Sequence, residues 1–194
     1  YKRQVVAHHA FYPALLELLK ARGLFPLHAG VVAREDAGLV ICGASGSGKT
    51  TLCLALAARG WALLADDTCF LRGDGDGVEA LAFWEDLHVT EETVRRFPSL
   101  DFLRHQPPRR ANWKKHFGVD QLEGLRLAER CRPRWIVFPS VAGGPASRLE
   151  PLGGAEAVLR LTPQSVVPAQ PGLLAPHMEL LAGLARQGRA LELA

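Results

Sequence analysis

Residues 43–50, the glycine loop, have the types and the spacing of a phosphate-binding loop. Glycines at positions 43, 46 and 48 precede Lys49 and Thr50, which matches the pattern G-x-x-x-x-G-K-[ST]. Glycines let the backbone wrap around an anion with its N–H groups directed inward. Lys49 is expected to reach the β- and γ-phosphates of ATP or GTP, and the Thr50 hydroxyl to ligate Mg²⁺. The nucleotide-binding candidates are Gly43, Ala44, Ser45, Gly46, Ser47, Gly48, Lys49, Thr50 and Thr51.

Two adjacent aspartates, Asp66 and Asp67, end the next apolar run, one predicted helix after Lys49. A strand–loop–helix–strand unit returns its second strand beside the first, so both carboxylates are expected near the phosphates. One would hold Mg²⁺, directly or through water, and the other would accept the proton of an incoming hydroxyl. The sequence does not tell which does which. The alternative is a turn-forming Asp-Asp pair, but its position after a phosphate loop favours the catalytic interpretation.

Basic residues gather in the segment Gln106–Lys115, where two prolines indicate a mobile loop. Its cations are Arg109, Arg110, Lys114 and Lys115. They are candidates for clamping a γ-phosphate or an acidic substrate, and an ordinary solvated loop is an equal alternative.

The elements that must position these residues alternate between strand and helix patterns. The strands are expected at Leu27–Ala33, Gly38–Cys42, Trp61–Ala65, Val78–Phe83, Trp135–Val141, Leu149–Leu152 and Ala190–Leu193. The helices are expected at Ala10–Ala21, Lys49–Arg59, Thr90–Phe97, Ala155–Leu161 and Ala175–Arg186. Gly60 is placed to end the helix that follows the glycine loop. This order predicts one α/β domain with a mixed sheet and flanking helices.

Composition narrows the class of protein. The 194 residues suit one domain over 1–194, with a helical segment at 1–23, a phosphate-loop core at 24–72 and the basic loop at 106–116. A net charge of +3 is too small to predict nucleic-acid binding, and no apolar run is long enough to span a membrane. Four cysteines without metal-ligand spacing suit a reducing cytoplasm. The chain begins with Tyr1 and not with Met, and the sequence does not tell whether an N-terminal region precedes it.

Three segments together resemble the kinase domain of the HPr kinase/phosphorylase family, whose fold is related to that of phosphoenolpyruvate carboxykinase. They are Leu27-His28-Ala29-Gly30, the loop Gly43–Thr51 and Leu64-Ala65-Asp66-Asp67. The resemblance is close over residues 24–72. Beyond them, the chain looks like HPr-kinase-like proteins of bacterial gene clusters, some of which modify peptides. The resemblance implies phosphate and magnesium binding by Lys49 and Thr50, a base and a metal contact from the acidic pair, and support of that pair by His28. It also implies a homo-oligomer, since family members are often oligomeric.

The chain departs from the family pattern in ways that bear on the substrate. Thr51 stands where the bifunctional enzymes usually carry an acidic residue, which argues against HPr as the substrate and against phosphorolysis. The family's acidic metal ligand after the acidic pair has no clear counterpart. Glu79, Glu85 and Asp86 are candidates, although a surface role is favoured for each.

The sequence therefore predicts an ATP- and Mg²⁺-dependent kinase that phosphorylates a hydroxyl, with a serine of a peptide or small protein as the favoured acceptor. A small-molecule kinase or carboxykinase-like enzyme is a second hypothesis, which anion-binding arginines beside the loop would favour. A third is an ATPase or a non-catalytic ATP-binding partner module, because the missing later motifs are those that a pseudoenzyme loses.

Overall fold

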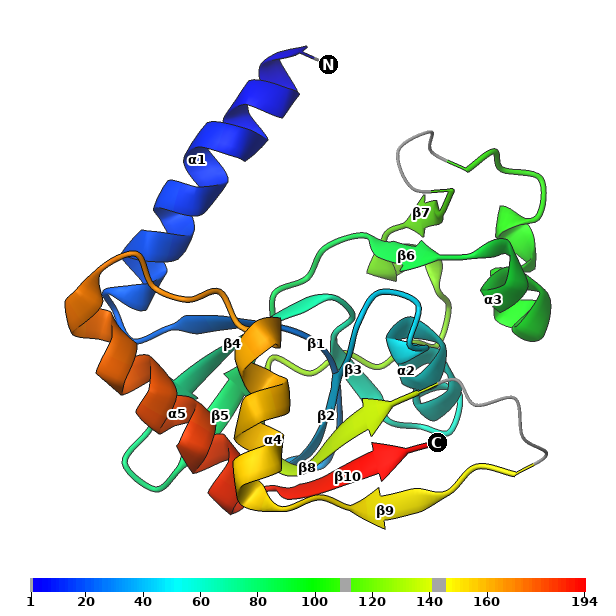
Figure 1. The fold of residues 1–194 in the computed structure, drawn as a ribbon. Coiled ribbons are helices and arrows are strands. Elements are labelled where there is room, and N and C mark those ends of the chain that lie inside the picture. Colours follow the sequence, from blue (N-terminus) through cyan, green and yellow to red (C-terminus); the bar gives the residue numbers. More distant parts are fainter. Residues whose placement is uncertain (1, 109–112, 141–145) are drawn as a thin grey trace.

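The structure is a computed structural model that describes residues 2–108, 113–140 and 146–194, with side chains from residue 11 onward. It is a mixed α/β arrangement of a main sheet with helices on both faces, as the sequence predicts (Figure 1). The main sheet contains β1 (Phe25–Arg34), β2 (Ala37–Cys42), β3 (Ala62–Ala65), β4 (Thr68–Gly73), β5 (Val78–Leu81), β8 (Arg130–Pro139), β9 (Leu149–Pro151) and β10 (Arg189–Leu193). The helices are α1 (Lys2–Lys20), α2 (Lys49–Ala57), α3 (Glu91–Arg96), α4 (Gly154–Leu161) and α5 (Leu174–Gln187).

Two long strands, β1 and β8, carry the sheet. The first half of β1 pairs with β4, and its second half pairs with β2 on one side and β3 on the other. Strand β8 pairs in turn with β5, β2 and β10. Strands β2, β8 and β10 are parallel neighbours, so their carboxyl ends meet at one edge of the sheet. In open α/β sheets this edge is where ligands bind.

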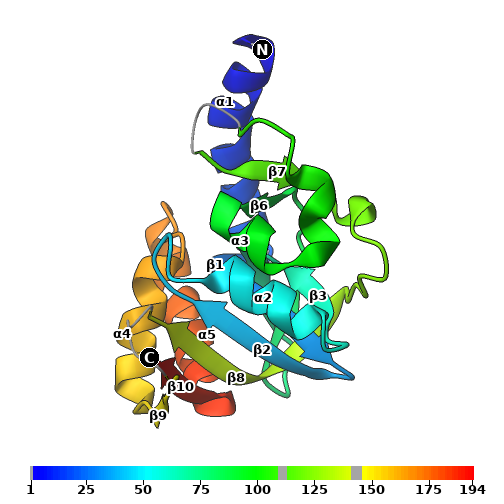
Figure 2. The ribbon, with the colours of Figure 1, turned by 90° about the vertical axis from the view of Figure 1, so that its right-hand side faces the viewer.

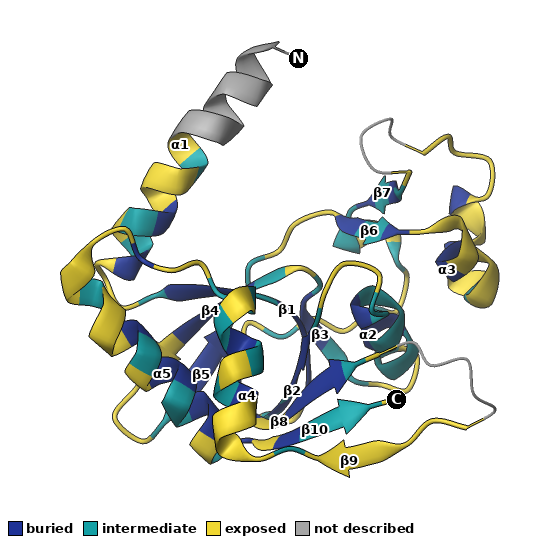
Figure 3. Cartoon of the chain, viewed as in Figure 1, coloured by how far each residue is buried: buried dark blue, intermediate teal, exposed yellow. Residues whose placement is uncertain are grey.

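Apolar side chains alternate between the two faces of the sheet and form two cores. Val31, Val40 and Leu64 face α4 and α5, whereas their neighbours Val32 and Ile41 face α2. Figure 2 shows α2 on the face opposite to α4 and α5. Because the central strands are buried on both faces, their apolar runs are nearly continuous. Helix α1 projects away from this body, and Figure 3 shows much of its described surface exposed.

A small unit is inserted between β5 and β8 and lies on the α2 side of the sheet (Figure 2). It contains the ribbon β6 (Leu87–Val89) and β7 (Lys115–Phe117), together with α3 and the 3₁₀ turns η1 (Pro98–Leu103) and η2 (Val119–Gln121). Buried side chains of this unit join the core that contains Cys53 and Leu54 of α2. The unit is thus fixed to the helix that follows the glycine loop.

Most predicted elements are confirmed, with boundary shifts of a few residues. Gly60 has φ +86°, and its N–H donates to the Ala57 carbonyl at 2.9 Å, which ends α2 as expected. Helix α1 begins eight residues earlier than predicted, at Lys2, and β8 begins five residues earlier, at Arg130. Strands β4, β6 and β7 were not predicted, and residues 141–145 lie outside the described residues. No helix of the described chain has the length and apolarity that crossing a membrane requires.

The remaining 3₁₀ turns, η3 (Thr162–Gln164) and η4 (Pro171–Leu173), connect α4 to α5.

Gly30 sets how closely α2 approaches β1. A Cβ at this position would stand 2.5 Å from Cys53 Sγ and 3.5 Å from the Asp66 carbonyl oxygen. We predict that Gly30→Ala lowers the free energy of unfolding by about 1–3 kcal/mol, because the buried thiol must move. Chemical denaturation of the single variants and of Gly30→Ala/Cys53→Ala measures the coupling. The double variant should lose less stability than the sum of the singles, and strict additivity would show that α2 does not limit this position.

Candidate functional site

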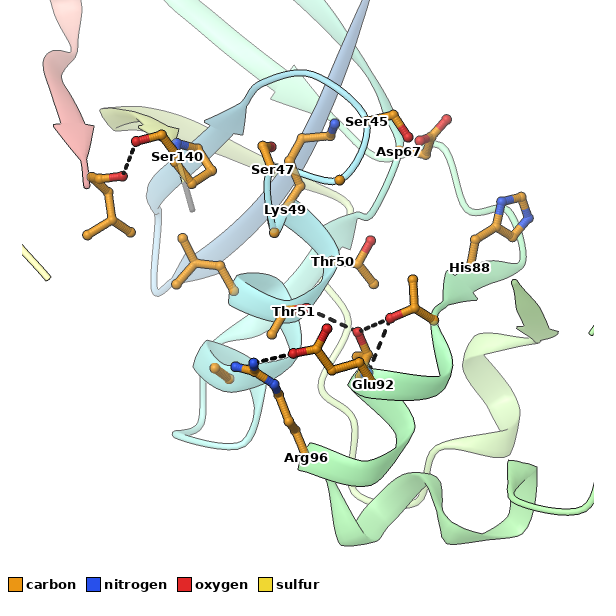
Figure 4. Close-up of a pocket in the computed structure, with 18 of the residues that line it drawn as sticks. Ser45, Ser47, Lys49, Thr50, Thr51, Asp67, His88, Glu92, Arg96 and Ser140 are labelled. Atoms are coloured by element: carbon orange, nitrogen blue, oxygen red, sulfur yellow. Dashed lines mark hydrogen bonds and ion pairs between the residues drawn. The ribbon is translucent and has the colours of Figure 1, made fainter. Parts of the chain in front are cut away.

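A cleft of about 660 Å³ opens at the carboxyl ends of the parallel strands, above the start of α2. Its lining comes from the glycine loop and α2, His28 of β1, Asp67 before β4, the inserted unit, the ends of β8 and β10, and the residues 146–147 before β9. Figure 4 shows side chains from these elements around the loop, with Lys49 and Ser47 near its centre. The predicted nucleotide-binding residues from Ser45 to Thr51 all line the cleft.

The loop from Gly43 to Gly48 makes a turn that residues with side chains rarely adopt. Gly46 and Gly48 have φ values of +85° and +95°, in the left-handed region that favours glycine. A Cβ on Gly43 would stand 2.7 Å from Ser47 Oγ. Helix α2 begins directly after this turn. The first N–H groups of a helix lack acceptors within it, and the first residues of α2 line the cleft. Such a helix start is suited to bind anions.

Lys49 is buried beneath the loop. Its ammonium donates to the carbonyl oxygens of Gly43 at 2.6 Å and Ala44 at 3.2 Å. Burial lowers the pKa of Lys49, and the negative charge of Asp67 opposes that shift. Lys49 therefore holds the two ends of the turn together while it stands beside the acidic pair.

Asp66 is tied to the glycine loop through Thr50. Strand β3 ends at Ala65, and the two aspartates lie in the connection to β4. The Asp66 carboxylate accepts hydrogen bonds from the Thr50 hydroxyl and the His88 backbone N–H, yet its Oδ1 is buried without a partner. Burial raises the pKa of Asp66 to about 6, and the neighbouring Asp67 charge adds to the shift. The surroundings of Asp66 therefore stabilise its charged form less well than water does.

Asp67 points the other way, into the cleft beside His28. His28 Nδ1 lies 3.4 Å from Asp67 Oδ1, and both side chains line the cleft. The hydrogen bond from His28 holds the pKa of Asp67 below its ordinary value. His28 reaches this position because β1 pairs with β4, which sets His28 opposite Thr68, the residue that follows Asp67. His28 and Gly30 are two residues apart and so share the face of β1 that meets α2.

The residues present fit a magnesium ion between Thr50 and Asp66. Magnesium prefers oxygen ligands and is commonly held by one or two carboxylates plus substrate phosphates. The unpartnered Asp66 Oδ1, next to the Thr50 hydroxyl, supplies such a ligand set. Within the described residues, no group of three His, Cys, Asp or Glu side chains could hold a metal by itself.

The three candidates for a further acidic ligand lie outside the lining of the cleft. Glu79 on β5 forms ion pairs with Arg72 at 2.6 Å and Arg130 at 3.8 Å. Glu85 and Asp86 are exposed in the connection before β6. The favoured surface role accords with the positions of Glu85 and Asp86 but not with that of Glu79, which is buried.

The basic segment divides into different roles. Lys114 lines the cleft, whereas Lys115, the other described candidate of this segment, does not. The Lys115 side chain is only 4% exposed and donates to the carbonyl oxygens of Leu103 at 2.7 Å and Arg104 at 3.1 Å. It belongs to strand β7, and its ammonium is used inside the inserted unit. Arg109 and Arg110 lie outside the described residues.

Several lining residues were missed by the sequence analysis. The inserted unit contributes His88, Thr90, Glu92, Thr93 and Arg96, and the strand ends contribute Ser140 and Leu193. Thr51 Oγ1 lies 3.2 Å from Thr93 Oγ1, which links α2 to the start of α3 (Figure 4). Thr90 caps the start of α3, where its hydroxyl accepts from the Thr93 N–H at 3.2 Å. A threonine just before a helical pattern is a local sequence signal for such a helix start. No local signal shows that this helix lies beside the glycine loop.

The sequence matches no protein-family model and no curated protein. Among solved structures, the chain is similar to the HPr(Ser) kinase/phosphatase from Coxiella burnetii, with a TM-score of 0.44 and 18% identity. The match covers 83% of this chain and 88% of that one. This likeness is one of chain path alone and says nothing about the chemistry of the site.

Asp66 should make the ligand-free protein less stable at neutral pH. Its folded pKa of about 6 lies above the ordinary value of 3.8, so the native state binds the proton more tightly than the unfolded state. The penalty is complete above pH 6 and disappears as the pH falls through 6 toward 4. We predict that Asp66→Asn raises the unfolding free energy at pH 7.5 by about 1–3 kcal/mol.

The measurement is the melting temperature of both proteins, without metal or nucleotide, between pH 7.5 and 4.5. The difference between variant and wild type should shrink as the pH falls, and the exposed control Asp76→Asn should show little difference at any pH. A wild type that melts at the same temperature as Asp66→Asn throughout would contradict a raised pKa.

Proposed function

We propose that this chain is an ATP- and Mg²⁺-dependent phosphotransferase of the P-loop, HPr-kinase-like and carboxykinase-like type. One observation carries the proposal: the glycine loop with Lys49 and Asp67 with His28 line a single cleft, and Asp66 is hydrogen-bonded to Thr50 of that lining. The start of α2 would bind the nucleotide phosphates, and Lys49 would leave the loop carbonyls to contact the β- and γ-phosphates.

We assign metal binding to Asp66 and proton acceptance to Asp67, because the surroundings of the two aspartates differ. Asp66, hydrogen-bonded to Thr50, would hold Mg²⁺ together with the Thr50 hydroxyl. Such an ion would supply positive charge that neutralises the charge of the nucleotide phosphates. Asp67 is ionised at neutral pH and faces the cleft, so it is the residue placed to accept a proton. His28 orients Asp67 through the 3.4 Å contact of Nδ1 with Oδ1.

In the proposed reaction the acceptor oxygen attacks the γ-phosphorus, and the bond between that phosphorus and the bridging oxygen of ADP breaks. The acceptor proton passes to the Asp67 carboxylate. Lys49 and the N–H groups of the loop stabilise the charge on the transferred phosphoryl group. The favoured acceptor is a serine hydroxyl of a peptide or small protein, in a reducing cytoplasm that suits the four free, buried cysteines.

The cleft lining gives less support to a small-molecule kinase with an anionic substrate. Arg96 is the arginine of the described lining, and its guanidinium is paired with Glu92 four residues earlier. That ion pair cancels the charge that a small anionic acceptor would need.

The role of Asp67 can be separated from nucleotide binding. We predict that Asp67→Asn binds Mg·ATP within about threefold of the wild-type affinity, because the phosphate loop is untouched, but loses about 10²–10⁴-fold in transfer rate. The assay is incubation with γ-labelled ATP, Mg²⁺ and candidate peptides, read by mass spectrometry as a gain of one phosphate.

Asp101→Asn removes an exposed carboxylate that pairs with Arg104 on the surface, and it should keep full activity. Equal turnover of Asp67→Asn and wild type would rule out Asp67 as the base. ATP hydrolysis without any phosphorylated acceptor would favour an ATPase instead.

A further inference from the structure

Two consecutive lysines, Lys114 just before β7 and Lys115 at its first position, have side chains in different surroundings. Lys115 is held inside the inserted unit by the carbonyl oxygens of Leu103 and Arg104, and by an ion pair with Glu91 Oε2 at 2.8 Å. These contacts join β7 to η1 and to α3. Consecutive side chains of an extended segment point to opposite sides. With Lys115 fixed inward, Lys114 is directed to the cleft, which it lines.

The surroundings of Lys114 place it at the acidic end of the cleft. Burial raises the pKa of Asp66, and the positive charge of Lys114 opposes part of that rise. The same charge adds to the burial that lowers the pKa of Lys49. The His88 backbone N–H, which bonds to Asp66, comes from β6, the strand that pairs with β7. The ribbon thus brings both a hydrogen-bond donor and a cation to this end of the cleft.

The two lysines of the described lining belong to different elements. Lys49 donates to Gly43 and Ala44 below the loop, and Arg96 is paired with Glu92 on the α3 side. A nucleoside triphosphate carries its greatest charge on the terminal phosphate, and phosphoryl transfer gains from a cation that contacts its oxygens from a second side. Lys49 approaches from α2, and Lys114 approaches from the inserted unit.

We propose that Lys114 is a second phosphate-binding cation that contacts the terminal phosphate opposite Lys49, with Lys115 as the residue that positions it. The inference rests on the proposed function, because it assumes a nucleoside triphosphate in this cleft. It predicts discrimination between nucleotides: Lys114 contributes to binding a triphosphate but not a diphosphate, whose β-phosphate lies in the glycine loop.

The test compares the affinities of wild type, Lys114→Met and Lys114→Arg for ADP and for a non-hydrolysable ATP analogue, with Mg²⁺, by calorimetry. Lys114→Met should weaken the analogue by at least about tenfold, as expected for the loss of a charge-assisted hydrogen bond, and change ADP by less than about twofold. Lys114→Arg, which keeps the charge, should restore most of the analogue affinity. Arg95→Met, which removes an exposed cation on α3, should bind both nucleotides as wild type does.

Each outcome separates the two proposals. An unchanged analogue affinity in Lys114→Met, or an equal loss for ADP and the analogue, overturns the role at the terminal phosphate. A folded wild type that binds neither nucleotide overturns the proposed function, and the inference falls with it. Thermal melting of Lys114→Met at the wild-type temperature shows that the loss is not one of folding. Lys115→Met should melt lower, because it removes two hydrogen bonds to backbone carbonyls and an ion pair made by a buried ammonium.

Discussion

The site depends on how the chain leaves β2, a strand buried on both faces, and enters α2 within six residues. Gly46 and Gly48 supply left-handed backbone conformations, and the absence of a side chain at Gly30 lets α2 lie close to β1. These constraints fix the start of α2 above the parallel strands β2 and β8. The inserted unit then rests on α2 through a shared core and through the contact of Thr51 with Thr93.

Neighbouring aspartates with different environments follow from this geometry. The chain turns between β3 and β4, so Asp66 is directed toward Thr50 and Asp67 toward His28. Burial raises the pKa of the first, and the histidine contact lowers the pKa of the second. Two carboxyl groups whose pKa values are driven apart are suited to two different tasks. This difference supports the assignment of Asp66 to the metal and Asp67 to the proton.

Local sequence signals were enough to predict the glycine loop, its flanking strand and helix, and most of the sheet, because each of these elements has its own apolar period or glycine pattern. The acidic pair was expected near the loop because the strand after α2 should return beside β2, but β1 lies between β2 and β3 and pairs with both. Asp67 nevertheless lines the cleft, since β3 is parallel to β2 and ends on the same side of the sheet. The three-residue strands β6 and β7 carry too short a pattern, and their pairing joins residues almost thirty positions apart. Lys114 and Lys115 look alike in sequence, and only the fold shows that one is buried.

The most direct test of the phosphate site is calorimetric titration of the wild-type chain and of Lys49→Met with Mg·ATP. We expect one nucleotide per chain for wild type and an affinity at least about tenfold weaker for Lys49→Met, because the variant loses a charged donor to the phosphates. Glu123→Gln, an exposed change away from the cleft, serves as the control and should bind like wild type. Absence of binding to a folded wild-type chain, or equal binding by Lys49→Met, would contradict the assignment of this cleft to nucleotide phosphates.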